Sequence, residues 1–163
     1  MKDSDLRILK KIVSEIEYLE KLLAEIDLDA FLADETIARA SSMTTINVGE
    51  LAKRLSEEFY TEHPGTELRF AAKTRDVYAH GYFTLSFETV YKTAVEDYPR
   101  LKLAVSEMIE AEEAARDALY EKELMEVIEG GRADMAAGRY VVGIENARER
   151  LRQLEDESSS GSE

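Results

Sequence analysis

The chain has 163 residues, of which 44% are hydrophobic, and a formal net charge of −14. That length accommodates one ordinary domain, or a small domain with an appendage, and the hydrophobic content suffices for one core. The absence of cysteine excludes disulfides, thiolate zinc sites, iron–sulfur clusters and cysteine nucleophiles. Only 2 prolines and 8 glycines favour long helices over a loop-rich β-sandwich.

The acidic balance disfavours a large surface for duplex DNA, because affinity for phosphates comes mainly from Lys and Arg. An acidic chain can still act on RNA through a small positive site, or bind a basic protein. The first residues, MKDSDLRILKK, contain no apolar segment of the kind found in signal peptides, and no run of 18 apolar residues occurs. We therefore expect a cytoplasmic protein without a membrane partner.

Apolar residues recur at steps of three and four over 5–26, which predicts an amphipathic helix. Ser4 or Asp5 is expected to cap that helix. The segment 27–34 is predicted to be a turn with a short helical piece around Phe31.

A second helix is predicted over 35–60, with Met43 among its core residues. The sequence His-Pro-Gly at 63–65 is expected to end it. A third helix is predicted over 66–80, ended by Gly81.

A fourth helix is predicted to start at Ser86, with Val95 on its apolar face. Asp97 is expected to cap a fifth helix that has Pro99 in its first turn. The expected core residues of this fifth helix are Leu101, Leu103, Val105, Met108 and Ile109. Because no strand-like alternation occurs before residue 139, the sequence predicts an all-α bundle of four or five helices over 1–115.

Residues 116–157 are predicted to form a C-terminal extension that is helical but sparse in large apolar residues. Gly130-Gly131 are expected to interrupt its first helix. A short strand is considered at 139–142, before a last helix over 144–157. Residues 158–163 are expected to be disordered.

The extension is also more acidic for its length than the bundle. Residues 111–163 hold 7 basic and 14 acidic residues, and residues 1–110 hold 14 and 21, so each part carries −7. The same charge on a much shorter segment suggests an appendage that cannot bury a core of its own.

The segment 69–83, RFAAKTRDVYAHGYF, is locally basic within this acidic chain. With the histidine protonated its balance is +3, from Arg69, Lys73, Arg75, Asp76 and His80. On a helix, the five-residue spacing between Arg75 and His80 gives about 140° of rotation and about 7.5 Å of rise. The two side chains of one copy therefore diverge, whereas a twofold-symmetric partner would bring two Arg and two His into one cleft.

Such a cleft suits RNA cleavage without a metal. Histidine has an unperturbed pKa near ~6.5 and exchanges a proton at neutral pH, and the 2′-hydroxyl of RNA is an internal nucleophile. Arg75 can hold the scissile phosphate and stabilise the charge that builds on it, and Asp76 can orient Arg75 or the histidine of a second copy. The alternative from spacing alone is a structural pair on the surface or in the bundle core, which occurs by chance in many helices.

Four segments of the N-terminal 110 residues carry a family pattern. They are FLADETIARA (31–40), NVGELAKRLSEEFYTEHP (47–64), RDVYAHGYF (75–83) and VYKTAVEDYPRLK (90–102). In order and spacing they resemble the HEPN superfamily, specifically its HepT-like toxins. The motif of that family is Arg, a polar residue, three further residues, His, any residue and Tyr, and its places are occupied by Arg75, Asp76, His80 and Tyr82. Two features depart from the pattern: Asp76 stands where Asn is usual, and Lys73-Thr74 replace a small hydrophobic pair.

The resemblance implies an all-α homodimer and a metal-independent endoribonuclease that uses no cofactor. Its composite site in the dimer cleft would contain Arg75, Asp76 and His80, with Arg69 and Lys73 as further RNA-contacting candidates. The resemblance also implies a toxin whose antitoxin is a minimal nucleotidyltransferase that attaches AMP to the motif tyrosine, here Tyr82. A nucleotide on that phenol would block RNA and add negative charge.

The C-terminal segment 124–154 resembles the toxin-binding part of type II antitoxins of the RelB, ParD and Phd sort. In that interpretation Arg139, Val141 and Val142 add a strand to the sheet edge of a toxin, and a flanking helix covers an apolar groove. The alternative function is therefore a binding module: a HEPN dimer with little nuclease activity whose acidic tail neutralises a basic RelE/ParE-like toxin. The alternative for the tail itself is a helical extension that packs on the bundle or lengthens the dimer interface.

Overall fold

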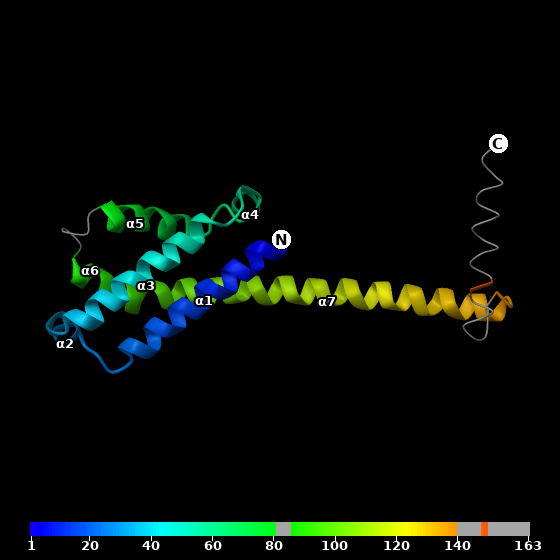
Figure 1. Ribbon diagram of the computed structural model, residues 1–163, viewed down its shortest axis with the longest axis horizontal. Helices are drawn as coiled ribbons and strands as arrows, with labels where there is room; N and C mark the ends of the chain where they lie inside the picture. Colours follow the sequence, from blue (N-terminus) through cyan, green and yellow to red (C-terminus); the bar gives the residue numbers. More distant parts are fainter. Residues whose placement is uncertain (81–85, 140–147, 150–163) are drawn as a thin grey trace. The chain divides into compact units, whose positions relative to one another are not determined.

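The computed structural model describes residues 1–80, 86–139 and 148–149; for residue 74 and for 76–80 it describes the backbone only. The chain divides into two compact units, Met1–Ala115 and Arg116–Glu163. The described part is helical and contains no β-strand, which confirms the all-α fold (Figure 1). Its elements are α1 (Asp3–Leu23), α2 (Leu28–Ala33), α3 (Glu35–Lys53), α4 (Glu57–Glu62), α5 (Leu68–His80), α6 (Phe87–Lys92), the π-helical turn η1 (Thr93–Asp97) and α7 (Tyr98–Ala136).

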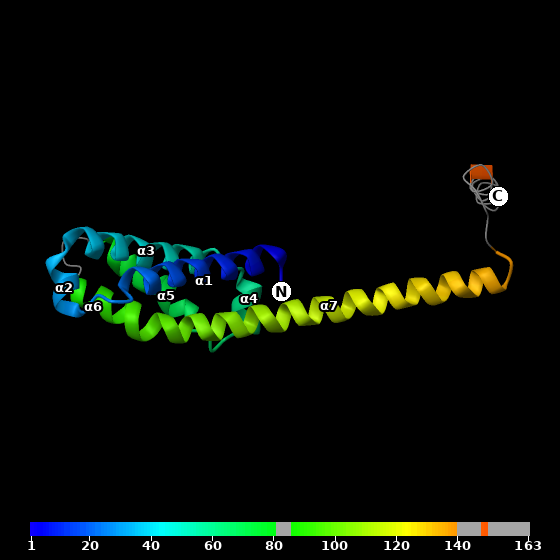
Figure 2. The same cartoon turned by 90° about the horizontal axis from the view of Figure 1, so that it is seen from below.

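The core of the first unit is formed by apolar residues that recur at helical spacing. On α1 the fully buried positions are Leu9, Ile12, Ile16 and Leu19, as the periodicity predicts. They pack against apolar side chains from the other helices of the unit, including Phe31, Val48, Phe59, Leu68, Val90 and Val105. Figure 2 shows α1 and α3 side by side, and the most extensive pairings are α3 with α5 and α1 with α3.

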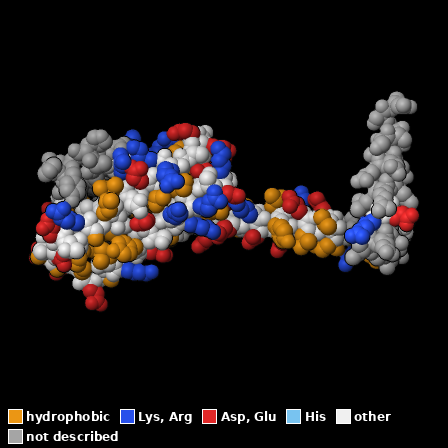
Figure 3. Space-filling model, viewed as in Figure 1, with side chains coloured by type: hydrophobic (Ala, Val, Ile, Leu, Met, Phe, Trp, Pro, Cys, Tyr) orange, Lys and Arg blue, Asp and Glu red, His pale blue; other side chains and the backbone are white. Residues whose placement is uncertain are grey.

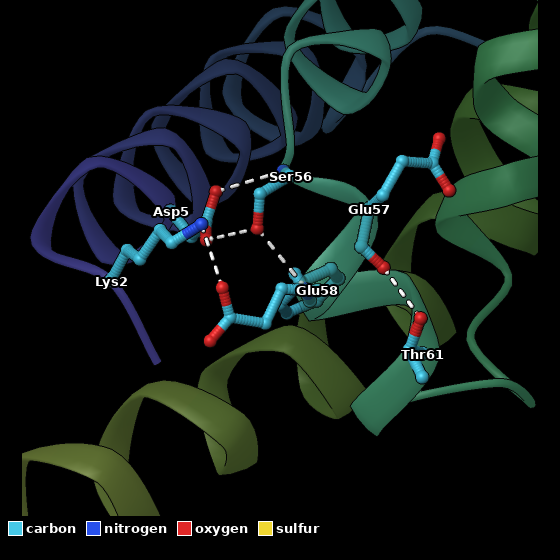
Figure 4. Close-up of polar contacts among 7 residues, drawn as sticks. Lys2, Asp5, Ser56, Glu57, Glu58 and Thr61 are labelled. Atoms are coloured by element: carbon cyan, nitrogen blue, oxygen red, sulfur yellow. Dashed lines mark hydrogen bonds and ion pairs between the residues drawn. The ribbon is translucent and has the colours of Figure 1, made fainter.

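The predicted cap of α1 is wrong. The helix begins at Asp3, and its N-cap residue, Lys2, makes no side-chain cap bond. Asp5 is instead buried, with 2% of its surface exposed. Its carboxylate accepts hydrogen bonds from the backbone N–H of Ser56 at 3.0 Å and from the Ser56 hydroxyl at 2.7 Å (Figure 4). A buried carboxylate needs such partners, so Asp5 ties α1 to the start of α4.

The helix predicted over 35–60 is two helices, α3 and α4. Ser56 has an extended backbone, and its hydroxyl accepts from the N–H of Phe59 at 3.1 Å, which makes it the N-cap of α4. Asp34 caps α3 in the same way, through the N–H groups of Thr36 and Ile37. The stop at 63–65 is confirmed, because α4 ends at Glu62 with His63 as its C-cap.

The interior face of α3 combines small hydroxyl residues with apolar ones. Its buried residues include Ser41, Ser42, Thr44 and Thr45, whereas Met43 is 67% exposed. The hydroxyl of Ser42 donates to the carbonyl of Ala38 at 2.7 Å, so burial leaves that group satisfied. Thr44 likewise donates to the carbonyl of Ala40 at 3.1 Å, whereas the buried hydroxyl oxygens of Ser41 and Thr45 have no such partner among the described residues. Hydropathy therefore placed Met43 on the wrong face, because α3 buries these small hydroxyl residues in its place.

The fourth and fifth predicted helices are joined without a break. Asp97 does not cap a new helix; it lies in η1, where the N–H of Tyr98 donates to the carbonyl of Thr93, five residues earlier. Pro99 lacks an N–H, and in an α-helix its ring would clash with the carbonyl oxygen four residues earlier. The wider π-helical turn avoids that clash. Val95 and Leu103, both predicted to be buried, are 38% and 63% exposed.

In the second unit, Gly130 and Gly131 do not interrupt the helix, because α7 continues to Ala136. The chain leaves the helix through Gly138, whose φ of 69° is left-handed. The N–H of Gly138 donates to the carbonyl of Met135, and that of Arg139 to the carbonyl of Asp134, which is a Schellman cap. The predicted strand over 139–142 lies outside the described residues except for Arg139. The predicted last helix lies outside them except for residues 148 and 149, which are helical. The predicted disordered end at 158–163 lies outside them entirely.

Candidate functional site

Helix α5 is one unbroken helix from Leu68 to His80 and carries residues 69–80 of the locally basic segment. The helix predicted over this stretch is thereby confirmed. Arg75 and His80 are five residues apart on it, so their positions differ by about 140° around the axis and about 7.5 Å along it. Within one copy of the chain, α5 thus directs these two residues to different sides of the helix.

Gly49 of α3 sets the position of Arg75. A Cβ atom at Gly49 would lie 2.4 Å from the Cβ of Arg75 and 2.7 Å from the backbone oxygen of Ala71. No side chain fits there without moving α5, so the glycine permits the two helices to approach closely. The approach places Arg75 directly against α3.

The Arg75 side chain forms an ion pair with Glu50, between Nε and Oε1. The pair is partly buried, with 26% of the arginine side chain and 39% of the glutamate side chain exposed. The sequence suggests Asp76 as the residue that orients Arg75 or the histidine of a second copy, and it gives no signal for Glu50. No local signal could have found Glu50, because it lies on another helix.

A hollow lies beside the N-terminal half of α5. It is lined by Lys53, Glu57, Tyr60, Arg69, Ala72 and Lys73. The guanidinium carbon of Arg69 lies 4.2 Å from the centroid of the Tyr60 ring, which is a cation–π contact. Arg69 and Lys73 were both predicted as RNA-contacting candidates; the structure brings them together and adds Lys53.

Tyr60 is held in place from two directions. Its hydroxyl donates to the backbone oxygen of Ala52 at 2.6 Å. Burial raises the pKa of Tyr60, while Arg69 lowers it and Glu57 raises it. The phenol therefore stays protonated at neutral pH and remains a donor. The helix that carries it, α4, is fixed by the bonds from Ser56 to Asp5 and by an ion pair of 2.7 Å between Lys2 and Glu58 (Figure 4).

Several predicted site residues have a backbone position only, or none. Asp76 and His80 lie on α5, and Tyr82 lies outside the described residues, as do Val141 and Val142. Arg139 is described: it caps α7, and its guanidinium donates to the Asp134 carboxylate at 3.0 and 2.9 Å. The first unit therefore holds the described candidates for RNA contact.

Neither a metal-binding cluster nor a membrane-spanning helix occurs among the described residues. Within those ranges no group of three or more His, Asp or Glu side chains could hold a metal ion. In the same part of the chain, every helix is too short or too polar to cross a lipid bilayer.

Comparison with known proteins identifies the first unit. A family model described as Ribonuclease HepT-like matches residues 12–108, more than half of the chain. A protein of Thermococcus cleftensis named as a probable ribonuclease HepT is 33% identical over 102 residues, which are 63% of this chain and 93% of that protein. A protein of Caldanaerobacter subterraneus subsp. tengcongensis, whose name assigns it provisionally as an RNase, is 28% identical over 104 residues, 64% of this chain and 93% of its own length.

No solved structure matches the chain significantly. The family match runs from α1 into α7 and includes all of α3 and α5, hence Gly49, Glu50 and Arg75. The second unit lies outside it. The matched range and the two relatives show that the chain belongs to the Ribonuclease HepT-like family.

Proposed function

We propose that this chain is a metal-independent endoribonuclease toxin that cleaves RNA at a composite site between two copies of the first unit. Family membership and the names of the relatives support the ribonuclease activity. The observation that carries the composite site is the register of α5, on which Arg75 and His80 diverge. A twofold axis brings the arginine of one copy to the histidine of the other.

The reaction needs one nucleophile and two proton transfers. The 2′-oxygen of the RNA attacks the adjacent phosphorus while its proton passes to a neutral His80. The bond from phosphorus to the 5′-oxygen breaks, and that oxygen takes a proton from solvent. The products are a 2′,3′-cyclic phosphate and a 5′-hydroxyl.

Arg75 stabilises the negative charge that builds on the phosphoryl oxygens. Its ion pair with Glu50 sets the position of the guanidinium. The carboxylate holds the guanidinium against α3 and partly neutralises it. We infer that Glu50 is a positioning residue for Arg75, and that Asp76 serves the histidine of the second copy. Glu50→Gln should then lower kcat, while the shape of the pH profile of cleavage should stay nearly the same.

The proposed regulation is transfer of AMP from ATP to Tyr82 by a partner nucleotidyltransferase. The tyrosine oxygen bonds to the α-phosphorus of ATP, and pyrophosphate leaves with the phenolic proton passed to solvent. The modified tyrosine carries a nucleotide two residues from His80, where it would exclude RNA and repel its phosphates. Mass spectrometry should show one added AMP on the wild-type chain and none on Tyr82→Phe.

Expression without a partner tests the activity. The wild-type chain should arrest bacterial growth with decay of cellular RNA, and the purified chain should cleave RNA in EDTA. His80→Ala should lower the cleavage rate by about 10²- to 10⁴-fold, the usual contribution of general acid–base catalysis. The matched control is His63→Ala, which removes the other histidine of the chain from a contact with the Phe59 ring and should change the rate little.

A mixing experiment tests the composite site. Arg75→Ala and His80→Ala, each inactive alone, should regain part of the wild-type rate when mixed, because a mixed dimer contains one intact Arg–His pair. Mixtures that stay inactive, although the two variants exchange subunits, would place both residues in a site within one copy.

A second candidate function has one observation in its favour, the exposed apolar residues on the second unit. Tyr120, Leu124, Val127, Ile128 and Met135 occupy one side of α7, within an arc of about 100°, and are 39% to 72% exposed. An acidic helix with such a face is suited to a basic partner with an apolar groove. The candidate function is therefore a binding module that neutralises a RelE/ParE-like toxin.

Rescue from such a toxin distinguishes the second candidate. Cells that express a basic RelE-like toxin encoded beside this chain should grow when the full chain is present. They should not grow when the chain ends at Tyr120. Equal rescue by both forms, or by neither, would contradict a binding role for the second unit.

A further inference from the structure

The hollow beside α5 concentrates positive charge in an acidic protein. The whole chain carries −14, yet three of the six residues that line this hollow are cations and one is acidic: Lys53, Arg69 and Lys73 against Glu57. Figure 3 shows Lys and Arg side chains at several places on the first unit, including the region of α4 and α5, with Asp and Glu side chains among them. The local charge of the hollow therefore favours an anion, although the net charge of the chain is negative.

Arg69 is pre-organised to receive that anion. Its guanidinium lies 4.2 Å above the Tyr60 ring, and the hydroxyl of Tyr60 is fixed on Ala52. A stacked guanidinium loses less freedom on binding and presents a planar fork that matches phosphate oxygens. The competing carboxylate of Glu57 is 3.9 Å away and its side chain is 91% exposed, so their ion pair is weak and a phosphate can replace it.

The register of α5 relates the hollow to the position of the proposed general acid and base. Lys73 follows Arg69 by one turn, and residue 80 follows Lys73 by seven positions, so all three positions fall within about 40° around the helix axis. Arg75 lies well outside that arc, against α3. From Lys73 to position 80 the helix rises by about 10.5 Å. An RNA strand along this side of α5 would reach the hollow with a phosphate that is not the one being cleaved.

We propose that the hollow formed by Lys53, Arg69 and Lys73 binds a backbone phosphate of RNA that flanks the scissile phosphate. This inference rests on the proposed function, since it assigns part of the same substrate. The contact is with phosphate, so it holds the strand without reading its sequence. The three cations act on binding of the substrate and not on the chemical step.

Binding can be measured apart from cleavage. The full chain with His80→Ala, which leaves RNA intact, is titrated with a fluorescent single-stranded RNA over a range of salt concentrations. Adding Lys53→Ala, Arg69→Ala and Lys73→Ala should weaken binding and reduce the salt dependence, which is the slope of log K against log salt, by about 0.7, the contribution of one lost phosphate contact on a single strand. Arg69→Lys alone should weaken binding less than Arg69→Ala, because it keeps the charge but loses the stacked fork.

The matched control removes the same residue types from another helix. Arg7, Lys11 and Lys21 are exposed on α1, so replacing them with alanine changes the net charge equally. This control should leave the salt slope within about 0.2 of its original value, well below the change of about 0.7 expected for one lost phosphate. An equal loss in both triple variants would mean that net charge alone governs binding and would overturn the hollow as a site.

Kinetics and competition separate the remaining outcomes. In the active chain, the triple variant of the hollow should raise KM about tenfold or more with kcat within about threefold; a loss confined to kcat would contradict the assignment. Displacement of the RNA by ATP at equimolar concentration, absent in the triple variant, would assign the hollow to a mononucleotide instead. If the wild-type chain binds RNA through the hollow but never cleaves it, the nuclease proposal fails and the hollow stands.

Discussion

The two units are both helical, but they differ in what their apolar side chains touch. In the first, Leu19 of α1 has no exposed surface and lies in a core shared by several helices. In the second, Leu119 is 57% exposed and Val127 is 72% exposed. Helix formation in the second unit therefore depends on backbone hydrogen bonds, good helix formers and a C-terminal cap, whereas the first is held by tertiary packing. The difference indicates that function requiring fixed geometry belongs to the first unit.

Glycines sharpen the comparison. Gly49 lies where α3 and α5 come together, and an added Cβ would clash with Arg75. Gly130 and Gly131 have no atom within 4 Å of an added Cβ. The same residue type is thus required by a helix contact in one unit and exposed to solvent in the other.

The largest expected difference comes from truncating one leucine in each unit. Leu19→Ala should lower the free energy of unfolding by about 2–5 kcal/mol, because it removes a fully buried side chain and leaves a cavity. Leu119→Ala should change it by less than about 0.5 kcal/mol. Urea unfolding followed by circular dichroism measures both. A comparable loss for Leu119→Ala would reveal that this side chain is buried in the assembly present in solution.

A glycine pair should give effects of opposite sign. Gly49→Ala is expected to destabilise the chain by about 1–3 kcal/mol, since the methyl group forces α5 away from α3. It should also lower RNA cleavage, because Arg75 moves with α5. Gly131→Ala should add helix propensity worth up to about 1 kcal/mol locally without affecting cleavage. Thermal melts and the cleavage assay report on the pair; unaltered stability and activity in Gly49→Ala would contradict the close approach.

Two aspartates test the polar contacts in the same way. Asp5→Ala leaves the N–H and hydroxyl of Ser56 without their acceptor and should cost about 1–3 kcal/mol. Asp134→Ala removes an exposed ion pair with Arg139 and should cost less than about 0.5 kcal/mol. Denaturant midpoints distinguish the two, and equal midpoints would show that the Asp5–Ser56 bonds do not stabilise α4.

The smallest effect is expected from removing the second unit. Every buried residue among those described lies at or before Val105, so a chain that ends at Tyr120 should unfold within a few degrees of the full chain. Calorimetry and light scattering measure the melting temperature and the mass. A large fall in either would mean that residues after Tyr120 contribute to the fold or to self-association.

The helices themselves were largely predictable. The periodic apolar residues of α1 and the helix over α5 are local signals, and the structure has both. The errors arose where a local signal had two meanings. Asp5 and Asp97 have the residue type of a cap, yet one is a buried anchor and the other lies within a continuous helix. Gly130-Gly131 suggested a break that an exposed helix tolerates at modest cost.

The amino-acid sequence by itself determined the all-α class, the basic segment on α5 and the register that separates Arg75 from position 80, because helical periodicity and spacing are properties of neighbouring residues. Only the tertiary structure decided that Glu50 pairs with Arg75, that Asp5 anchors Ser56 across 51 positions, and that Lys53 joins Arg69 and Lys73 in one hollow. These partners lie on different helices, and no local pattern encodes which helices pack together. Their pairing follows from how the bundle excludes water from its core.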